Sequence, residues 1–161
     1  MPNLILIRGL PGTGKSTFAH ELIARSRTNV FLLETDQFFT SARTCDAHGR
    51  KVLDYKFDRR LLGAAHDMCY GHTMHALFNG WDVIVANNFV TRREVDRYIQ
   101  GVQRSGLDVK IDIVVMHDAG LFQSTHNVPQ SAIDRMRSRW EDYPDEVPHT
   151  PVVRSTYEGE E

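Results

Sequence analysis

Short apolar runs alternate along the chain with segments of helical periodicity. The runs contain few polar positions, which is typical of strands covered on both faces, and residues 17–26 place Phe18, Leu22 and Ile23 on one helical face. We expect strands at residues 3–7, 30–33, 83–86 and 109–116, and helices at 17–26, 58–78, from 91 onward and at 129–140. Because strands and helices alternate, the pattern predicts an α/β protein: a parallel sheet with helices on both faces.

The segments between these elements carry the signals that end them. Asp58 is a typical N-cap, and Thr91 with Glu94 forms a capping-box pattern. Residues 41–53 show no period and predict a long loop, and the segment from about 143 is rich in proline and acidic residues and predicts a loosely packed tail. The length of 161 residues fits a single domain over 1–161.

The carboxyl ends of the strands are where a ligand site is expected. Right-handed crossovers bring these ends to one edge of a parallel sheet, and ligands bind at that edge. The segments that follow the strands are therefore the informative ones, and they span 9–16, 36–39, 87–89 and 117–127.

The segment after the first strand fits the phosphate-binding loop G-x-x-x-x-G-K-[ST], with a strand before it and a helix after it. Glycines let its backbone wrap a phosphate, while N–H groups and the positive helix end face the anion. Lys15 would reach the β- and γ-phosphates, and Ser16 would hold Mg²⁺. We therefore expect ATP and Mg²⁺ as cofactors, bound by Gly9, Pro11, Gly12, Thr13, Gly14, Lys15, Ser16 and Thr17.

Phosphoryl transfer also needs a base and cations. Asp36 follows an apolar strand and could accept a proton from an attacking hydroxyl, the alternative being a helix N-cap. Arg135 and Arg139 are four residues apart, so they share a helix face and are candidates for the γ-phosphate, the alternative being a solvated basic face.

Two asparagines end the third strand. Many P-loop nucleotide hydrolases have an aspartate there to hold Mg²⁺, whereas Asn87 is uncharged, which weakens a motor-type ATPase interpretation. Asn87 and Asn88 could instead read a base edge or a sugar through their amides, the alternative being an ordinary loop turn.

Composition narrows the partners only slightly. The net charge of −2 gives no overall attraction to nucleic acid or membrane. Fifteen arginines against four lysines suit phosphate recognition or reflect a GC-rich genome. No signal peptide or membrane-spanning run is visible, so we expect a soluble, cytoplasmic protein.

Several of these pieces together resemble the kinase domain of phage polynucleotide kinase and its relatives. The pieces are residues 9–17, Thr35-Asp36, the strand at 83–85 with the polar turn and helix after it, and Val128-Pro129 opening a helix with Arg135. A related eukaryotic and phage group shares Tyr55-Lys56-Phe57, Leu61, Ala65-His66, Cys69, Ala76 and Gly80. The resemblance covers most of residues 3–141 and implies a P-loop kinase fold. It also implies that Lys15 and Ser16 bind ATP and magnesium and that Asp36 is the general base.

Three departures from that family concern the acceptor. Its arginine three residues after the base is Phe39 here, its aspartate after the third strand is Asn87, and Gln123-Ser124-Thr125-His126 brings no arginine to the lid. Phe38 and Phe39 put rings where a phosphate clamp would stand, and rings suit base stacking, the alternative being that at least one belongs to the core. This is similar to small phage kinases that phosphorylate 5-hydroxymethyluracil within DNA.

The leading hypothesis is a kinase that transfers the γ-phosphate of ATP to a hydroxyl in DNA, with the base hydroxymethyl ahead of the 5′-hydroxyl. DNA is then the expected substrate partner, and no membrane or protein partner is indicated. A kinase acting on a free nucleoside, sugar or antibiotic is a second hypothesis. A nucleotide-binding interaction module without turnover is a third.

Overall fold

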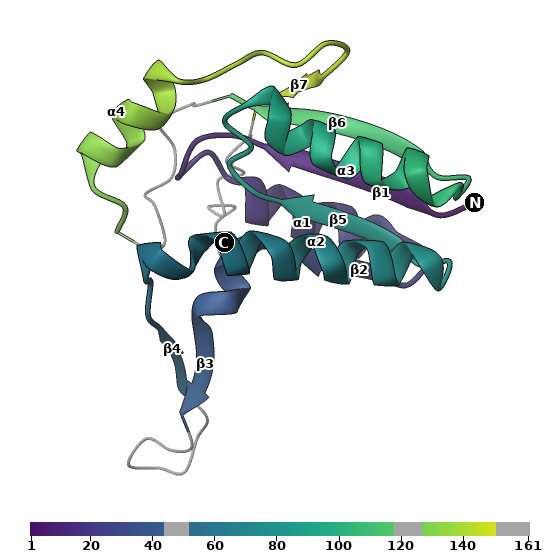
Figure 1. The fold of residues 1–161 in the computed structure, drawn as a ribbon, viewed down its shortest axis with the longest axis horizontal. Coiled ribbons are helices and arrows are strands. Elements are labelled where there is room, and N and C mark those ends of the chain that lie inside the picture. The colour runs from purple at the N-terminus through teal and green to yellow at the C-terminus, as the bar shows by residue number, and fades with distance from the viewer. Residues whose placement is uncertain (44–51, 118–126, 151–161) are drawn as a thin grey trace, which may run out of the picture.

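Five parallel strands form the central sheet, in the order β2-β5-β1-β6-β7 (Figure 1). The computed structural model describes residues 1–43, 52–117 and 127–150. The sheet strands are β1 Asn3–Arg8, β2 Val30–Leu33, β5 Asp82–Ala86, β6 Lys110–Met116 and β7 Val147–His149. The helices are α1 Lys15–Arg25, α2 Leu62–Phe78, α3 Arg92–Ser105 and α4 Gln130–Ser138. The predicted α/β architecture is confirmed, with all four expected strands and all four expected helices present.

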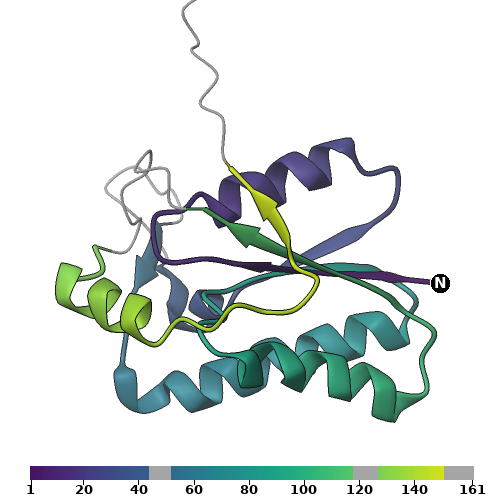
Figure 2. The ribbon, with the colours of Figure 1, turned by 90° about the horizontal axis from the view of Figure 1, so that it is seen from above.

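Alternate residues of the strands pack against different helices. Leu4 and Leu6 of β1 belong to the core that α2 and α3 cover, whereas Ile7 packs with Ala19 of α1 on the other face. Figure 2 shows α1 on one side of the sheet and α2 with α3 on the other. β1 lies between β5 and β6 and is covered by helices on both faces. Only its two ends are therefore left uncovered, at the amino and carboxyl edges of the sheet.

The helix starts follow their capping chemistry. The capping box of Thr91 and Glu94 is formed at the start of α3, as expected. The helix expected from residue 58 begins later, because the Asp58 carboxylate accepts a hydrogen bond from the Arg60 N–H and caps the short 3₁₀ helix η2, Arg59–Leu61. That turn leads directly into α2.

The structure corrects two expectations about irregular segments, in the part of each that it describes. The predicted loop at 41–53 contains two strands, β3 Thr40–Arg43 and β4 Val52–Tyr55, which pair antiparallel. The segment from about 143, expected to be loosely packed, contains β7, which adds to the sheet edge beside β6, whereas residues 151–161 lie outside the described residues. Local sequence did not reveal either, because both elements are three or four residues long and owe their formation to a partner strand.

Arg8, at the end of β1, is fully buried and explains why the tail packs. Its Nη1 donates to the Glu146 carboxylate at 2.7 Å, and Nη2 donates to the carbonyls of Glu141 and Phe89, each at 2.7 Å. The guanidinium carbon lies 4.3 Å from the centre of the Trp140 ring. A buried charge is tolerated when its hydrogen bonds are made, so this side chain helps to hold the segment before β7, together with the contacts of Arg92 to Glu141 and Asp142.

No helix among the described residues is long and apolar enough to cross a bilayer.

Truncating the acid that pairs with Arg8 is expected to destabilise the fold. Glu146→Ala leaves a buried guanidinium without its counter-charge, which costs about 3 kcal/mol in the free energy of unfolding. The control is Asp67→Ala, which breaks the exposed pair with Arg97 and costs less than about 1 kcal/mol. Urea denaturation followed by circular dichroism measures both, and equal small losses would contradict the role given to Arg8.

Candidate functional site

The segments that follow β1, β2 and β5 meet at the carboxyl edge of the sheet. The Gly9 N–H donates to the Asn88 carbonyl at 3.2 Å, and the Thr35 N–H donates to the Asn87 side-chain carbonyl at 2.8 Å. Figure 1 places α4 and the β3–β4 hairpin at this same end, opposite the N-terminus. The site expected from the strand ends is therefore assembled in one place.

The loop between β1 and α1 has the backbone that a phosphate cradle needs. Gly12 and Gly14 both have φ of 82°, a left-handed conformation that glycine adopts without strain, and α1 begins at the next residue, Lys15. Thr13 is buried, and its hydroxyl donates to the Leu10 carbonyl at 2.8 Å, which ties the loop to itself. N–H groups at the start of α1 are then available to an anion.

Lys15 lies across the mouth of this loop. Lys15 is half-buried as a residue. Its Nζ donates hydrogen bonds to the carbonyls of Gly9 and Leu10, at 2.9 and 3.0 Å, and to Asn88 Oδ1, at 3.1 Å. Burial lowers the pKa of Lys15 to about 8, although the charges of Glu34 and Asp36 oppose the shift. The ammonium thus has three uncharged oxygen acceptors, and a phosphate would add a negatively charged one.

Ser16 has a partner that the sequence analysis missed. Its hydroxyl donates to Oε1 of Glu34, the half-buried residue that follows β2. The negative charge of Glu34 also raises the pKa of Lys15, against the effect of burial. Its position at a strand end, two residues before Asp36, was the signal that could have identified it.

Asp36 lies inside the 3₁₀ helix η1, Thr35–Phe39, so the alternative that it caps a helix is wrong. Its carboxylate accepts a hydrogen bond from the Tyr55 hydroxyl at 3.1 Å. Burial, and then the charge and hydrogen bond of Asp36, raise the pKa of Tyr55 to about 12, so the phenol remains a proton donor at neutral pH. The β3–β4 hairpin therefore positions the carboxylate that is the candidate base.

Asn87 does not present its amide to a ligand. The residue is 7% exposed; Oδ1 accepts the Thr35 N–H and Nδ2 donates to the Cys69 sulfur at 3.6 Å. The expectation that Asn87 reads a base edge or a sugar was wrong, because its amide is used to hold η1 against β5. Asn88 is also engaged, with Oδ1 on Lys15 and Nδ2 3.7 Å from the Met136 sulfur of α4.

The aromatic side chains beside Asp36 divide into core and surface. Phe39 is 5% exposed and meets Phe38, Tyr55 and Phe57 in edge-to-face contacts, so it is core rather than a free stacking face. Phe38 is half-buried, and Phe57 is 54% exposed. The most exposed ring of this group is thus Phe57, two residues after Tyr55. The substrate role expected for Phe39 was wrong, because its ring is buried.

Arg135 and Arg139 are exposed on and just after α4. Arg135 Nε donates back to the Ser131 carbonyl at 3.3 Å, and the structure brings neither guanidinium onto the phosphate loop. The lid residues Gln123, Ser124, Thr125 and His126 lie outside the described residues. A role of these arginines at the γ-phosphate stays a prediction that requires α4 to approach the loop.

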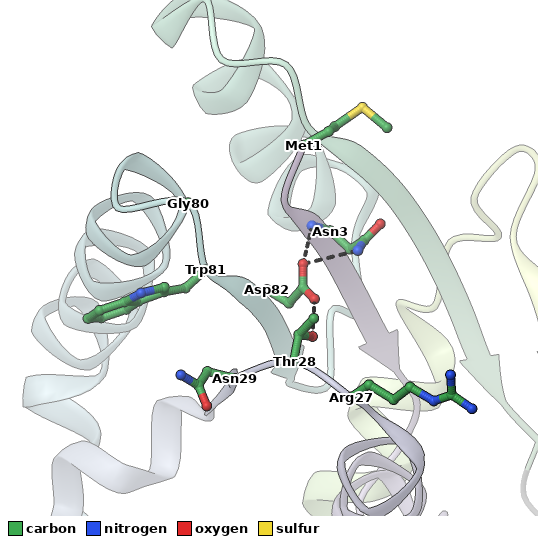
Figure 3. Close-up of a pocket in the computed structure, with 8 residues that line it drawn as sticks. All are labelled: Met1, Asn3, Arg27, Thr28, Asn29, Gly80, Trp81 and Asp82. Carbon is green, nitrogen blue, oxygen red and sulfur yellow. Dashed lines mark hydrogen bonds between the residues drawn. The ribbon is translucent and has the colours of Figure 1, made fainter.

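A hollow lies at the opposite, amino edge of the sheet, between β1, β2 and β5 (Figure 3). Its central carboxylate, Asp82, accepts hydrogen bonds from the Asn3 backbone and side chain, at 2.7 and 3.0 Å, and from the Thr28 hydroxyl. These groups satisfy one another and tie strand ends together. The hollow is remote from the phosphate loop and is not part of the candidate site.

A family of proteins described as the AAA domain matches residues 4–142, which include every element of the site. The chain belongs to this family. The match extends from β1 beyond the end of α4, so the phosphate loop, η1 and the β5 end are all parts of the AAA domain rather than additions to it.

Solved structures that resemble this AAA domain include several kinases. A gluconokinase from Sinorhizobium meliloti 1021 aligns with a TM-score of 0.58 at 14% identity, covering 92% of this chain and 82% of that one. Chaetomium thermophilum Kti12 in complex with ADP-AlF3 aligns at 0.63 and 15%, covering 91% and 88%. A chain of the Pnkp1/Rnl/Hen1 complex aligns at 0.54 and 17%, covering 98% of this chain but 43% of its own length. At these identities the likeness establishes the P-loop kinase fold and no particular acceptor.

Nucleotide binding to the AAA domain is expected to protonate Lys15. At pH 8.5 much of the free protein carries a neutral Lys15, and a phosphate favours the ammonium, so binding of ATP takes up on the order of half a proton. ATP affinity accordingly falls as the pH rises past about 8. Calorimetry in buffers of different ionisation enthalpy measures the uptake. Lys15→Arg stays charged and abolishes it, whereas equal uptake in both proteins would rule out Lys15 as the group.

Proposed function

We propose that this protein is an ATP- and Mg²⁺-dependent kinase that phosphorylates a hydroxyl in DNA, the hydroxymethyl group of 5-hydroxymethyluracil before the 5′-hydroxyl. The observation that supports a kinase is the position of Lys15 and Asp36 at one sheet edge, where Ser16, next to Lys15, donates to Glu34, two residues before Asp36. A phosphate cradle and a positioned base are the two halves of a phosphoryl-transfer site.

The reaction follows from these groups. The loop and Lys15 hold the β- and γ-phosphates, and Asp36 accepts the proton of the acceptor hydroxyl while its oxygen bonds to the γ-phosphorus. The bond between that phosphorus and the β–γ bridging oxygen breaks, and ADP leaves with the electron pair. The Ser16 hydroxyl and the Glu34 carboxylate form an oxygen-donor set that fits Mg²⁺, which would neutralise charge on the phosphates.

The acceptor assignment is supported by the aromatic cluster. Phe57 offers an exposed ring just after the hairpin whose Tyr55 holds Asp36, and it packs on Phe39 of η1, so a flat base stacked there would place its substituent near the carboxylate. Base stacking on an aromatic ring contributes roughly 1–3 kcal/mol and does not require a phosphate clamp. A base inside a duplex would have to leave the stack to reach this surface.

Purified protein, γ-labelled ATP and three kinds of acceptor test the proposal. We expect label on DNA that contains 5-hydroxymethyluracil. Label only on DNA with a free 5′-hydroxyl would select a polynucleotide kinase, label only on nucleosides or sugars a small-molecule kinase, and none on any acceptor a non-catalytic module.

Asp36→Asn is expected to reduce turnover by roughly 10²–10⁴-fold while the affinity for an ATP analogue is retained, because the amide cannot take the proton but still accepts the Tyr55 hydrogen bond. Asp108→Asn, on the exposed turn before β6 at the opposite edge, is the matched control and leaves turnover unchanged. Full activity of Asp36→Asn would remove the base assignment.

Removing the exposed ring is expected to weaken acceptor binding alone. Phe57→Ala raises KM for the modified DNA on the order of tenfold, as expected for the loss of one stacking contact, and leaves kcat and KM for ATP unchanged. Phe78→Ala is the matched control, since Phe78 is 61% exposed at the far end of α2. Equal effects of the two substitutions on KM would show that the Phe57 ring does not contact the acceptor.

A further inference from the structure

The carboxyl end of β5 supplies no negative charge to the candidate site. Asn87 stands there, and both halves of its amide are bonded to protein groups, the Thr35 N–H and the Cys69 sulfur. In P-loop nucleotide hydrolases this strand end carries the aspartate that holds Mg²⁺ together with the loop serine or threonine. A magnesium site in this chain needs its carboxylate from elsewhere.

The neighbouring strand supplies one. Glu34 follows β2, and its Oε1 accepts the hydrogen bond that Ser16 Oγ donates. This bond fixes the hydroxyl hydrogen toward Glu34 and leaves the oxygen lone pairs for a cation. A carboxylate that accepts the proton of a ligating hydroxyl fixes its orientation and makes its oxygen a better donor to the ion.

Asn87 contributes to this arrangement as a buried support. The hydrogen bond from the Thr35 N–H to Asn87 Oδ1, 2.8 Å long, holds the peptide that joins Glu34 to η1. β2 and β5 are paired up to Leu33 and Val85. The backbone is therefore held before Glu34 by the strand pairing and after it by the Asn87 hydrogen bond. The carboxylate is thereby placed beside the loop serine by the residue that replaces the usual aspartate.

We propose that Glu34 is the carboxylate of the Mg²⁺ site, and that the negative charge provided by β5 in other P-loop proteins is provided here by β2. Glu34 orients the Ser16 hydroxyl and balances the charge of the ion, while Asn87 positions Glu34 through Thr35. The proposal rests on the proposed binding of Mg²⁺ and ATP but not on the acceptor. Within the described ranges no group of three or more His, Cys, Asp or Glu side chains forms a metal cage, so the ion would share its coordination with the nucleotide phosphates.

Binding of Mn²⁺ to the complex with a non-hydrolysable ATP analogue tests this role. Electron paramagnetic resonance counts free Mn²⁺ and requires neither turnover nor an acceptor. We expect Glu34→Gln to weaken Mn²⁺ binding by 10–100-fold, because the amide carries no charge and no longer polarises the Ser16 hydroxyl as a carboxylate does. Affinity for the analogue without metal is retained. Glu21→Gln, on the exposed face of α1, is the matched control and leaves Mn²⁺ affinity unchanged.

Two further variants keep the test decisive. Glu34→Asp retains the charge on a shorter side chain and is expected to bind Mn²⁺ between the wild type and Glu34→Gln, and Ser16→Ala is expected to lose the ion. Wild-type Mn²⁺ affinity in Glu34→Gln, with loss in Ser16→Ala, would overturn the proposal. If the wild type itself binds no ATP analogue, the proposed function fails, which is distinguishable from a wild type that binds the analogue and Mn²⁺ regardless of Glu34.

Discussion

The arrangement at the carboxyl edge depends on one buried charge, the guanidinium of Arg8. It ends β1 directly before the phosphate loop and contacts three later segments, through the Phe89 carbonyl, the Glu141 carbonyl with the Trp140 ring, and the Glu146 carboxylate. A buried, unpaired charge is costly, so the Arg8 guanidinium favours a fold in which all of these segments are in place. The side chain that precedes the loop thus also contacts the residues that lie between α4 and β7.

At the same edge, the negative charge beside the loop serine comes from a different strand than in P-loop nucleotide hydrolases. Asn87 replaces an acid and becomes a structural amide, and the acid nearest the loop serine is Glu34 on the adjacent strand. Lys15 reflects the result: burial lowers its pKa, whereas Glu34 and Asp36 oppose the shift. Such a site suits a polyanion that binds together with a cation. The polyanion pairs with the partly desolvated ammonium, and the cation pairs with the two carboxylates.

The sequence predicted those features that repeat along the chain or that a motif encodes. The apolar runs located four sheet strands, the glycine pattern located the phosphate loop, and the strand ends located Asp36. The β3–β4 hairpin, β7 and the partners of Arg8 were not predictable, because each depends on contacts between residues far apart in sequence. Burial decided the remaining cases: Asn87 and Phe39 look like ligand contacts in sequence, yet both face the interior, and the exposed ring is Phe57.

The acceptor side of the site follows from how the hairpin is attached. Phe39 is the last residue of η1, and it packs edge-to-face against Tyr55 and Phe57, so the position of the base and that of the exposed ring are set by the same buried side chain. Tyr55 then fixes the carboxylate through its hydroxyl. An acceptor stacked on Phe57 would therefore be aligned with Asp36. An acceptor held by α4 would depend on a helix that meets the segment after β5 through the weak contact between Asn88 Nδ2 and the Met136 sulfur. Rigid support for the base and the ring together favours a flat acceptor recognised by its face over a flexible one recognised by many hydroxyl groups.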